Sequence, residues 1–184
     1  MNITKVLSAV LIGIFMLTLS GCGNDEEIQA LLDKGIKQHN LGNDVEAINL
    51  FNKVIKLSPE NSEAWANLGN AYNAIQNYDK AIDSLKKAVD INPNNAYAWI
   101  CLGSGYNNKE DYDNAIECIK KALRISNLSN DENSSAQSIL GVAYANKGEL
   151  ERGLEYLNEA TKLNSLNEYA WENIEIIKKK LAKQ

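Results

Sequence analysis

The chain has 184 residues, of which 45% are hydrophobic and 23% are charged, and its formal net charge is −5 at pH 7. This acidic balance lacks the basic footprint that nucleic-acid binding requires, so we expect no nucleic-acid partner. The single histidine, His39, leaves little from which to build a multi-histidine metal site or a histidine-based catalytic dyad. We therefore expect no metal site, no cofactor and no enzymatic activity.

The start of the chain, from Met1 to Gly21, has the features of an export signal. Lys5 is the only charged residue in this stretch, and a largely apolar run of 14 residues extends from Val6 to Leu19. Such a run is too short for an ordinary membrane-spanning helix but suits the hydrophobic region of a signal peptide. It ends in the letters L-S-G-C, which finish at Cys22 and resemble the lipobox of bacterial lipoproteins.

That resemblance implies that residues 1–21 are cleaved and that Cys22 carries a covalent diacylglycerol and acyl lipid, such as palmitate. Residues 22–27 would then be a short tether between the lipid and the folded domain. We expect the protein to be exported and anchored through its lipid to the extracytoplasmic face of the bacterial cell membrane, or to the outer membrane if the source has one. An ordinary signal peptide and a short anchor helix are the alternatives.

Residues 62–95 form a unit whose pattern indicates two helices. The motif W-x-x-L-G-x-x-Y, which begins at Trp65, places its members on one stripe at helical spacing. Gly69 has no side chain, so a second helix can approach closely there, opposite the small residue Ala81. Pro93 cannot continue a helix and ends the second one. A lone helix pair cannot bury this apolar surface, so neighbouring copies are expected to stack.

The spacing of these residues resembles that of the tetratricopeptide repeat, or TPR. The resemblance covers residues 28–184 and implies an all-α, right-handed solenoid with a concave groove. It consists of four helix-turn-helix repeats and a C-terminal capping helix. The repeats are residues 28–61, 62–95, 96–129 and 134–167, and the capping helix is residues 168–184.

Positions outside the signature predict local structure. Asn61 is a predicted N-cap, because its side chain can satisfy free backbone N–H groups. Gly42 is expected to adopt the left-handed turn between two helices. Gly153 permits close helix packing at a cost in helix stability of about 0.5–1 kcal/mol against alanine. Residues 130–133 are an insertion between repeats, which we expect to be a surface loop, either a lengthened turn or a contact loop.

The groove of TPR proteins is lined by five positions in the first helix of each repeat. Transferred to the second and third repeats, the resemblance implies a partner-binding set of Glu63, Asn70, Asn73, Tyr97, Ile100, Ser104, Asn107 and Asn108. No lysine or arginine occupies these positions in any repeat, so the carboxylate clamp of some relatives is not available. We expect an uncharged groove in which asparagines donate to and accept from an extended or helical segment of another protein. Because asparagine is abundant throughout the chain, its enrichment in the groove has a compositional explanation as an alternative.

Two cysteines, Cys101 and Cys118, remain once Cys22 is lipidated, and both lie in the third repeat. An exported compartment would allow a disulfide between them. The family geometry, however, points position 101 somewhat away from the partner helix. A disulfide and two free, partly buried thiols are both left open.

These expectations describe a membrane-anchored scaffold or adaptor that binds another protein of the bacterial cell envelope and performs no chemistry itself. Self-association into a homo-oligomer through the ends of the solenoid is one alternative. Accessory binding of cell-wall glycan is another, and it would use Tyr97, Tyr169 and the asparagines.

Overall fold

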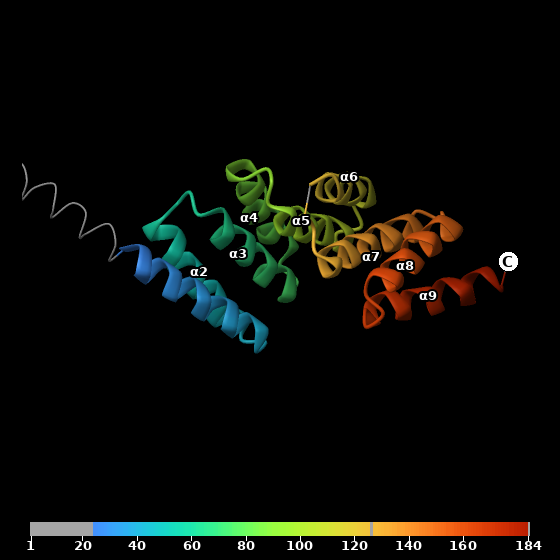
Figure 1. The fold of residues 1–184 in the computed structure, drawn as a ribbon, viewed down its shortest axis with the longest axis horizontal. Helices are drawn as coiled ribbons and strands as arrows, with labels where there is room; N and C mark the ends of the chain where they lie inside the picture. Colours follow the sequence, from blue (N-terminus) through green and yellow to red (C-terminus); the bar gives the residue numbers. More distant parts are fainter. Residues whose placement is uncertain (1–23, 126, 184) are drawn as a thin grey trace, which may run out of the picture. The chain divides into compact units, whose positions relative to one another are not determined.

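The computed structural model describes residues 24–125 and 127–183, and every regular element within them is an α-helix (Figure 1). The chain divides into two compact units, the first ending at Pro59 and the second beginning at Glu60. The predicted signal peptide and the predicted lipidation site at Cys22 lie outside the described residues. Among the helices of the described ranges, none is both long and apolar enough to cross a membrane.

The first unit is a helical hairpin made of residues 24–40 and α2 (Asp44–Leu57). Residues 24–27, which we expected in the tether, are instead an exposed first turn of this hairpin. Gly42 has the predicted left-handed backbone, with φ of 77°, and so allows the tight turn between the two helices. Phe51 is fully buried and anchors the small core of the hairpin.

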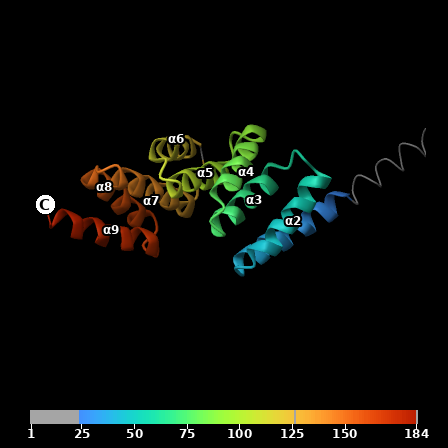
Figure 2. The ribbon, with the colours of Figure 1, turned by 180° about the vertical axis from the view of Figure 1, so that it is seen from behind.

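The second unit contains three further hairpins followed by a single helix (Figures 1 and 2). Its helices are α3 (Ser62–Ala74), α4 (Tyr78–Ile91), α5 (Ala96–Asn108), α6 (Tyr112–Leu123), α7 (Asn130–Asn146), α8 (Leu150–Leu163) and α9 (Glu168–Leu181). The hairpins pair α3 with α4, α5 with α6, and α7 with α8, while α3, α5, α7 and α9 also contact one another in succession. Stacking of this kind confirms the predicted all-α solenoid.

The signature glycine marks the place where the two helices of a hairpin meet. A Cβ atom on Gly69 would lie 3.0 Å from the carbonyl oxygen of Ala81, the residue predicted to face it. The contact is tightest in the last hairpin, where a Cβ on Gly153 would come within 2.7 Å of the Gly141 carbonyl oxygen. In both cases the atom that the Cβ would meet belongs to the backbone of the facing helix. Only glycine therefore fits without moving a helix.

The turns within the hairpins of the second unit each contain one residue with a left-handed backbone. Gly148 takes this conformation in the last hairpin, with φ of 91°. Gln76 and Glu110 take it in the other two, with φ of 61° and 63°. A side chain is unfavourable in this region of backbone space, so these two turns carry local strain that the glycine turn avoids.

Asparagine side chains cap the starts of α3, α5 and α9. The Asn61 side chain accepts the backbone N–H three residues further on at 2.8 Å, as predicted, and Asn95 and Asn167 do the same at 3.0 Å. The amide nitrogens of Asn95 and Asn167 also donate to the hydroxyls of Ser62 and Ser134, at 3.3 and 2.8 Å. Many of the asparagines therefore have structural roles at helix ends, which sequence composition alone did not suggest.

The insertion at residues 130–133 is not a loop, contrary to our expectation, because it forms the first turn of α7. The Glu132 backbone N–H donates to the Ser129 hydroxyl at 3.2 Å, and the Ser129 backbone N–H donates to the Glu132 carboxylate at 2.9 Å. This reciprocal arrangement is a capping box, which stabilises a helix start. The insertion therefore lengthens α7 by about one turn beyond the repeat register.

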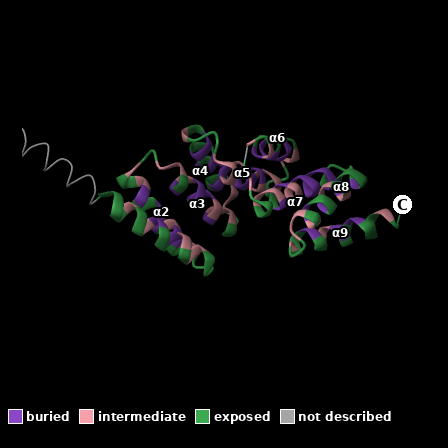
Figure 3. Ribbon diagram, in the orientation of Figure 1, coloured by how far each residue is buried: buried purple, intermediate pink, exposed green. Residues whose placement is uncertain are grey.

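The buried residues of the second unit form three clusters, each of which joins a hairpin to the element that follows it. Figure 3 marks the buried positions along the ribbon. The first surrounds Leu85 and the second surrounds Ile119 and Leu140. The third surrounds Leu157 and joins α7 and α8 to Ile174 of α9. Each hairpin thus completes its core with residues of its neighbour, which is why the hairpins stack.

Helix α9 lies where the first helix of another repeat would lie. Two of its residues, however, are unsuited to packing against a following helix. Its inner face is buried, with Ala170 and Ile174 at 0% exposure and Ile177 at 3%. Glu175 and Lys178 stand where the repeat signature has its glycine and its tyrosine, and they form an ion pair at 3.2 Å. The face that would receive a partner helix is therefore charged, as befits a capping helix.

Candidate binding groove

Two adjoining hollows, with cavity volumes of about 360 and 390 Å³, open along the first helices of the second unit. They share Ser104, Ser135 and Ile139, and we refer to them together as the groove. One hollow is lined by Asn70, Tyr97, Ile100, Cys101, Ser104, Asp131, Glu132, Ser135 and Ile139. The other is lined by Ser104, Asn108, Ser135, Ser138, Ile139, Asn167 and Tyr169.

Helix α5 supplies one wall of the groove from a single face. Tyr97, Ile100, Cys101 and Ser104 recur at the i, i+3, i+4, i+7 spacing that brings helical side chains onto one side. Helix α7 supplies the facing wall, to which Ile139 contributes a half-buried apolar side chain. The groove thus offers apolar surface between neutral hydroxyl and amide groups, a combination suited to a polypeptide.

Tyr97 is held in place by a hydrogen bond from the preceding hairpin. Its hydroxyl accepts a hydrogen bond from the Asn70 amide nitrogen at 2.8 Å, which links α5 to α3. Burial raises the pKa of the Tyr97 phenol well above its usual value, so the side chain is neutral at physiological pH. Burial likewise raises the pKa of the adjacent Cys101 thiol to about 12. Both groups therefore behave as neutral packing and hydrogen-bonding groups.

The structure brings together most of the residues predicted to line the groove. Asn70, Tyr97, Ile100, Ser104 and Asn108 all line one hollow or the other. This arrangement agrees with the transferred positions, and whether these residues contact a partner stays a prediction.

Three of the predicted residues do not line the hollows. Glu63 lies exposed at the start of α3 and acts electrostatically on Tyr97. Asn73 is half-buried, and its amide nitrogen donates to the Cys101 carbonyl oxygen at 3.0 Å, across the interface between α3 and α5. Asn107, at the same position one repeat later, has a buried side-chain oxygen with no hydrogen-bond partner among the described residues. Asn73 therefore belongs to the packing of α3 against α5.

The groove is not uncharged, which corrects our expectation. Asp131 and Glu132, from the added first turn of α7, line one hollow. A hydrogen bond from the Ser129 backbone lowers the pKa of Glu132, so this carboxylate is ionised at neutral pH. Sequence reasoning missed both residues because the repeat register assigned them to a loop, although the S-x-x-E spacing from Ser129 was a signal for a helix start.

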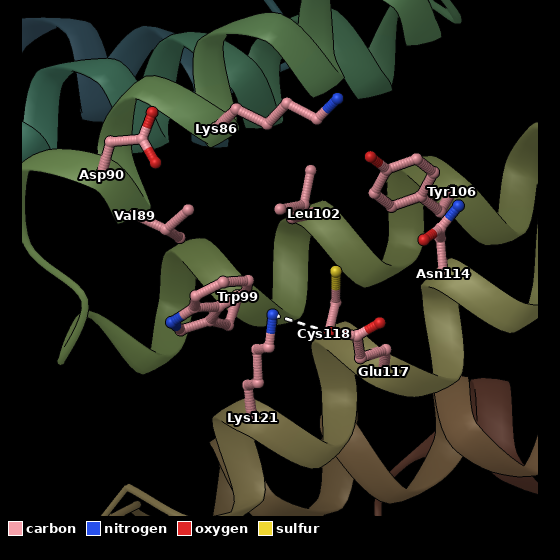
Figure 4. Close-up of a pocket in the computed structure, with 10 residues that line it drawn as sticks. All are labelled: Lys86, Val89, Asp90, Trp99, Leu102, Tyr106, Asn114, Glu117, Cys118 and Lys121. Carbon is pink, nitrogen blue, oxygen red and sulfur yellow. Dashed lines mark ion pairs between the residues drawn. The ribbon is translucent and has the colours of Figure 1, made fainter.

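A separate hollow lies on the other side of α5, between α4 and α6 (Figure 4). Trp99, Leu102 and Tyr106 line it from α5, on the face opposite to the one that lines the groove. Lys121 lies over the Trp99 ring, 4.7 Å from its centroid, and pairs with Glu117 at 2.8 Å. Lys86, from α4, lies over the Tyr106 ring, 5.8 Å from its centroid.

Cys101 and Cys118 are both free and buried, so the alternative of a disulfide between them is not realised in this structure. The reason is geometric, since Cys101 faces the groove while Cys118 faces the hollow on the other side of α5. Burial raises the pKa of Cys118 to about 11, so neither thiol has the character of an activated nucleophile.

Side chains that could hold a metal ion are not grouped together in the described part of the chain. Within residues 24–125 and 127–183, no group of three or more histidine, cysteine, aspartate or glutamate side chains is arranged to hold a metal ion. His39 lies in the first unit, beside Asp44, and does not take part in the groove.

A solenoid of stacked helical hairpins with a groove along its first helices defines a helical-repeat protein, a class that uses extended concave surfaces for binding. Family profiles described as tetratricopeptide repeat match residues 62–95 and 102–168, and one described as TPR repeat matches residues 39–76. The chain belongs to the tetratricopeptide repeat family. Proteins of this family act in general as interaction scaffolds.

Solved structures of similar fold support this assignment. A structure of MamA shares 27% sequence identity, with 83% of this chain and 81% of that chain covered and a TM-score of 0.65. PilF from Pseudomonas aeruginosa shares 19% identity over 88% of this chain and 72% of that chain, with a TM-score of 0.76. A thermophilic TPR protein from Thermus thermophilus shares 19% identity over 84% of this chain and 82% of that chain, with a TM-score of 0.74. No curated protein matches the chain significantly in sequence.

Proposed function

We propose that this chain is a lipid-anchored adaptor of the bacterial cell envelope, which holds a segment of another protein in its groove. The observation that carries the proposal is the groove itself. Ile100 and Ile139 present apolar surface from facing helices, and Ser104 and Ser135 place hydroxyls beside them. Such a surface can bury apolar side chains of a partner while satisfying its backbone polar groups.

The anchor part of the proposal is supported by the sequence before the first unit. The apolar run from Val6 to Leu19 leads into the L-S-G-C motif, whose cysteine is Cys22. A lipid on that cysteine would keep the solenoid at the outer face of a membrane without a membrane-spanning helix. The absence of an enzymatic activity is likewise proposed, and the raised pKa values of Cys101 and Cys118 support it.

Site-specific photo-crosslinking in living cells tests the adaptor. Photoreactive residues placed at Ser104 and Ser135 would lie in the groove, and one placed at the exposed Lys87 of α4 serves as the control. We expect the same protein to be captured from both groove positions and not from Lys87. The substitution Ile139→Asn should weaken that capture, because it replaces apolar surface of the groove wall with a neutral amide. Equal capture from all three positions, or none from the groove, would contradict the adaptor.

The anchor is tested separately by the substitution Cys22→Ser. A clickable fatty acid supplied to the cells should label the unchanged chain and leave the variant unlabelled. The variant should also lose its membrane association on fractionation. Lipid labelling that persists in the variant would rule out Cys22 as the lipidation site.

Self-association is a second candidate, favoured by apolar side chains exposed near the last helix. Leu166 is 84% exposed, and Trp171 is 47% exposed. Light scattering should then report a mass that rises with protein concentration, and the pair of substitutions Leu166→Ser and Trp171→Ser should abolish that rise. A monomer at all concentrations would remove this candidate.

A further inference from the structure

We propose that the segment bound in the groove is cationic, carrying lysine or arginine next to an apolar side chain. This inference rests on the proposed adaptor function and states the chemistry of its partner. It follows from the charges that line the groove, which are all of one sign, and from the helix turn that brings them there.

The charges at the groove come from α7 and α3. Asp131 and Glu132 line the hollow that also contains Ile100 and Ile139. Glu63 adds a third carboxylate near the same end, because it acts electrostatically on Tyr97, which lines the hollow. Among the residues that the structure describes, no lysine or arginine lines either hollow of the groove. An incoming positive charge would therefore be attracted, and an acidic segment would be repelled.

The two carboxylates of α7 are not fully occupied by contacts within the chain. One oxygen of Glu132 accepts from Ser129, and one oxygen of Asp131 accepts from the Asn164 amide nitrogen at 2.9 Å. Each carboxylate has a second oxygen that can accept from a ligand. Both carboxylates also interact favourably with the positive end of the α7 dipole. Because the first turn of α7 lines the groove, their negative charge is presented there.

The positive group is a side chain of the partner and not a metal ion. No cluster of three or more acidic, histidine or cysteine side chains suited to a metal is found in the described part of the chain. A lysine ammonium or an arginine guanidinium needs only one or two carboxylates, and its aliphatic stem can lie on Ile139 while its charge reaches Asp131 or Glu132.

Selection from a pool of random short peptides on the immobilised full chain tests the inference directly. Sequencing of the retained peptides should show lysine and arginine enriched over aspartate and glutamate, together with apolar residues. The variant Asp131→Asn/Glu132→Gln should lower this enrichment by about threefold or more, within the range expected for exposed charge pairs. Both substitutions keep side chains that can accept the existing hydrogen bonds, and glutamine also serves in a capping box.

A control variant with the same net charge as the α7 variant tests whether peptide binding depends on the groove carboxylates or on the overall negative charge of the protein. Glu151→Gln/Glu155→Gln removes two exposed carboxylates from α8, which does not line the groove. We expect this variant to retain peptides as the unchanged protein does. The inference is overturned if the α7 variant keeps the full enrichment, if the α8 variant loses as much, or if no cationic enrichment occurs.

The same charge variants in the cellular crosslinking experiment distinguish failure of the inference from failure of the adaptor. If the probe at Ser104 captures its partner equally well with Asp131→Asn/Glu132→Gln, the groove binds but the cationic partner is wrong. If Ser104 captures nothing specific in either background, the adaptor itself is wrong. Capture that falls in the α7 variant and persists in the α8 variant supports both.

Discussion

The Tyr97 hydroxyl accepts a hydrogen bond from the Asn70 amide nitrogen at 2.8 Å, and this bond joins the first helices of two consecutive hairpins. Because Tyr97 lines the groove, the same contact fixes a groove side chain and couples the repeats. Tyr97→Phe removes the bond with little change in shape, so we expect a loss of unfolding free energy of about 0.5–1.5 kcal/mol.

A double-mutant cycle in urea measures that coupling. The cycle compares Asn70→Ala, Tyr97→Phe and the double variant. The double variant should lose less unfolding free energy than the sum of the losses in the two single variants. Strict additivity of the two substitutions would mean that the bond contributes nothing to stability.

Alkaline pH should destabilise the second unit through Cys101. Its pKa is raised from 9.0 to about 12 by burial, so the folded state holds the proton that the unfolded state releases. The stabilisation is therefore complete below about pH 9 and is lost as pH rises toward 12, by at most about 1.4 kcal/mol per pH unit from this group. Cys101→Ala should flatten that part of the curve of unfolding free energy against pH. An equally steep fall in the variant would contradict the assignment to Cys101.

Gly153→Ala should destabilise the last hairpin although alanine is the better helix former. Its Cβ would come within 2.7 Å of the Gly141 carbonyl oxygen and 2.8 Å of the Ala145 Cβ, so α7 and α8 must move apart. We expect a net loss of about 1–2 kcal/mol in thermal or urea unfolding. The matched control is Gly105→Ala, whose Cβ would meet the Asn73 side-chain oxygen at 3.1 Å. A side chain can yield where backbone cannot, so this variant should lose less unfolding free energy than Gly153→Ala, although Asn73 must shift.

Replacing Gln76 or Glu110 by glycine should stabilise the protein. Both residues have a positive φ, of 61° and 63°, which glycine adopts without steric cost. Relief of that strain exceeds the extra flexibility that glycine gives the unfolded chain, so each change should add about 0.5–1 kcal/mol. Gly148→Ala, at the corresponding turn with φ of 91°, should act in the opposite direction. Melting temperatures of the three variants provide the measurement, and a fall for Gln76→Gly would show that the turn is unstrained.

Residues with a short-range physical role were predictable from sequence. Gly69, Asn61 and Pro93 act on their own turn or on the helix beside them, so the pattern of a single repeat was enough to locate them. Tyr97 and Ser104 were found because their helix positions repeat from one unit to the next.

Residues whose role depends on a neighbouring helix were harder to predict. Asn73 was assigned to the groove, but Gly105 of the next hairpin leaves space into which its side chain packs. Asp131 and Glu132 were assigned to a loop because the repeat length was taken as constant, whereas the capping box at Ser129 starts α7 earlier. The acidic side of the groove therefore became visible only in three dimensions.

A solenoid in which all repeat interfaces are alike could accept further repeats at its end unless the last helix differs from the others. In α9, Glu175 and Lys178 provide this difference, because they form an ion pair where the repeat signature has the glycine and tyrosine that contact the next helix. Internal duplication of a repeat would leave both residues at the end of the array. The number of repeats can therefore change during evolution without exposing a glycine-lined helix face that would receive another helix of the same kind.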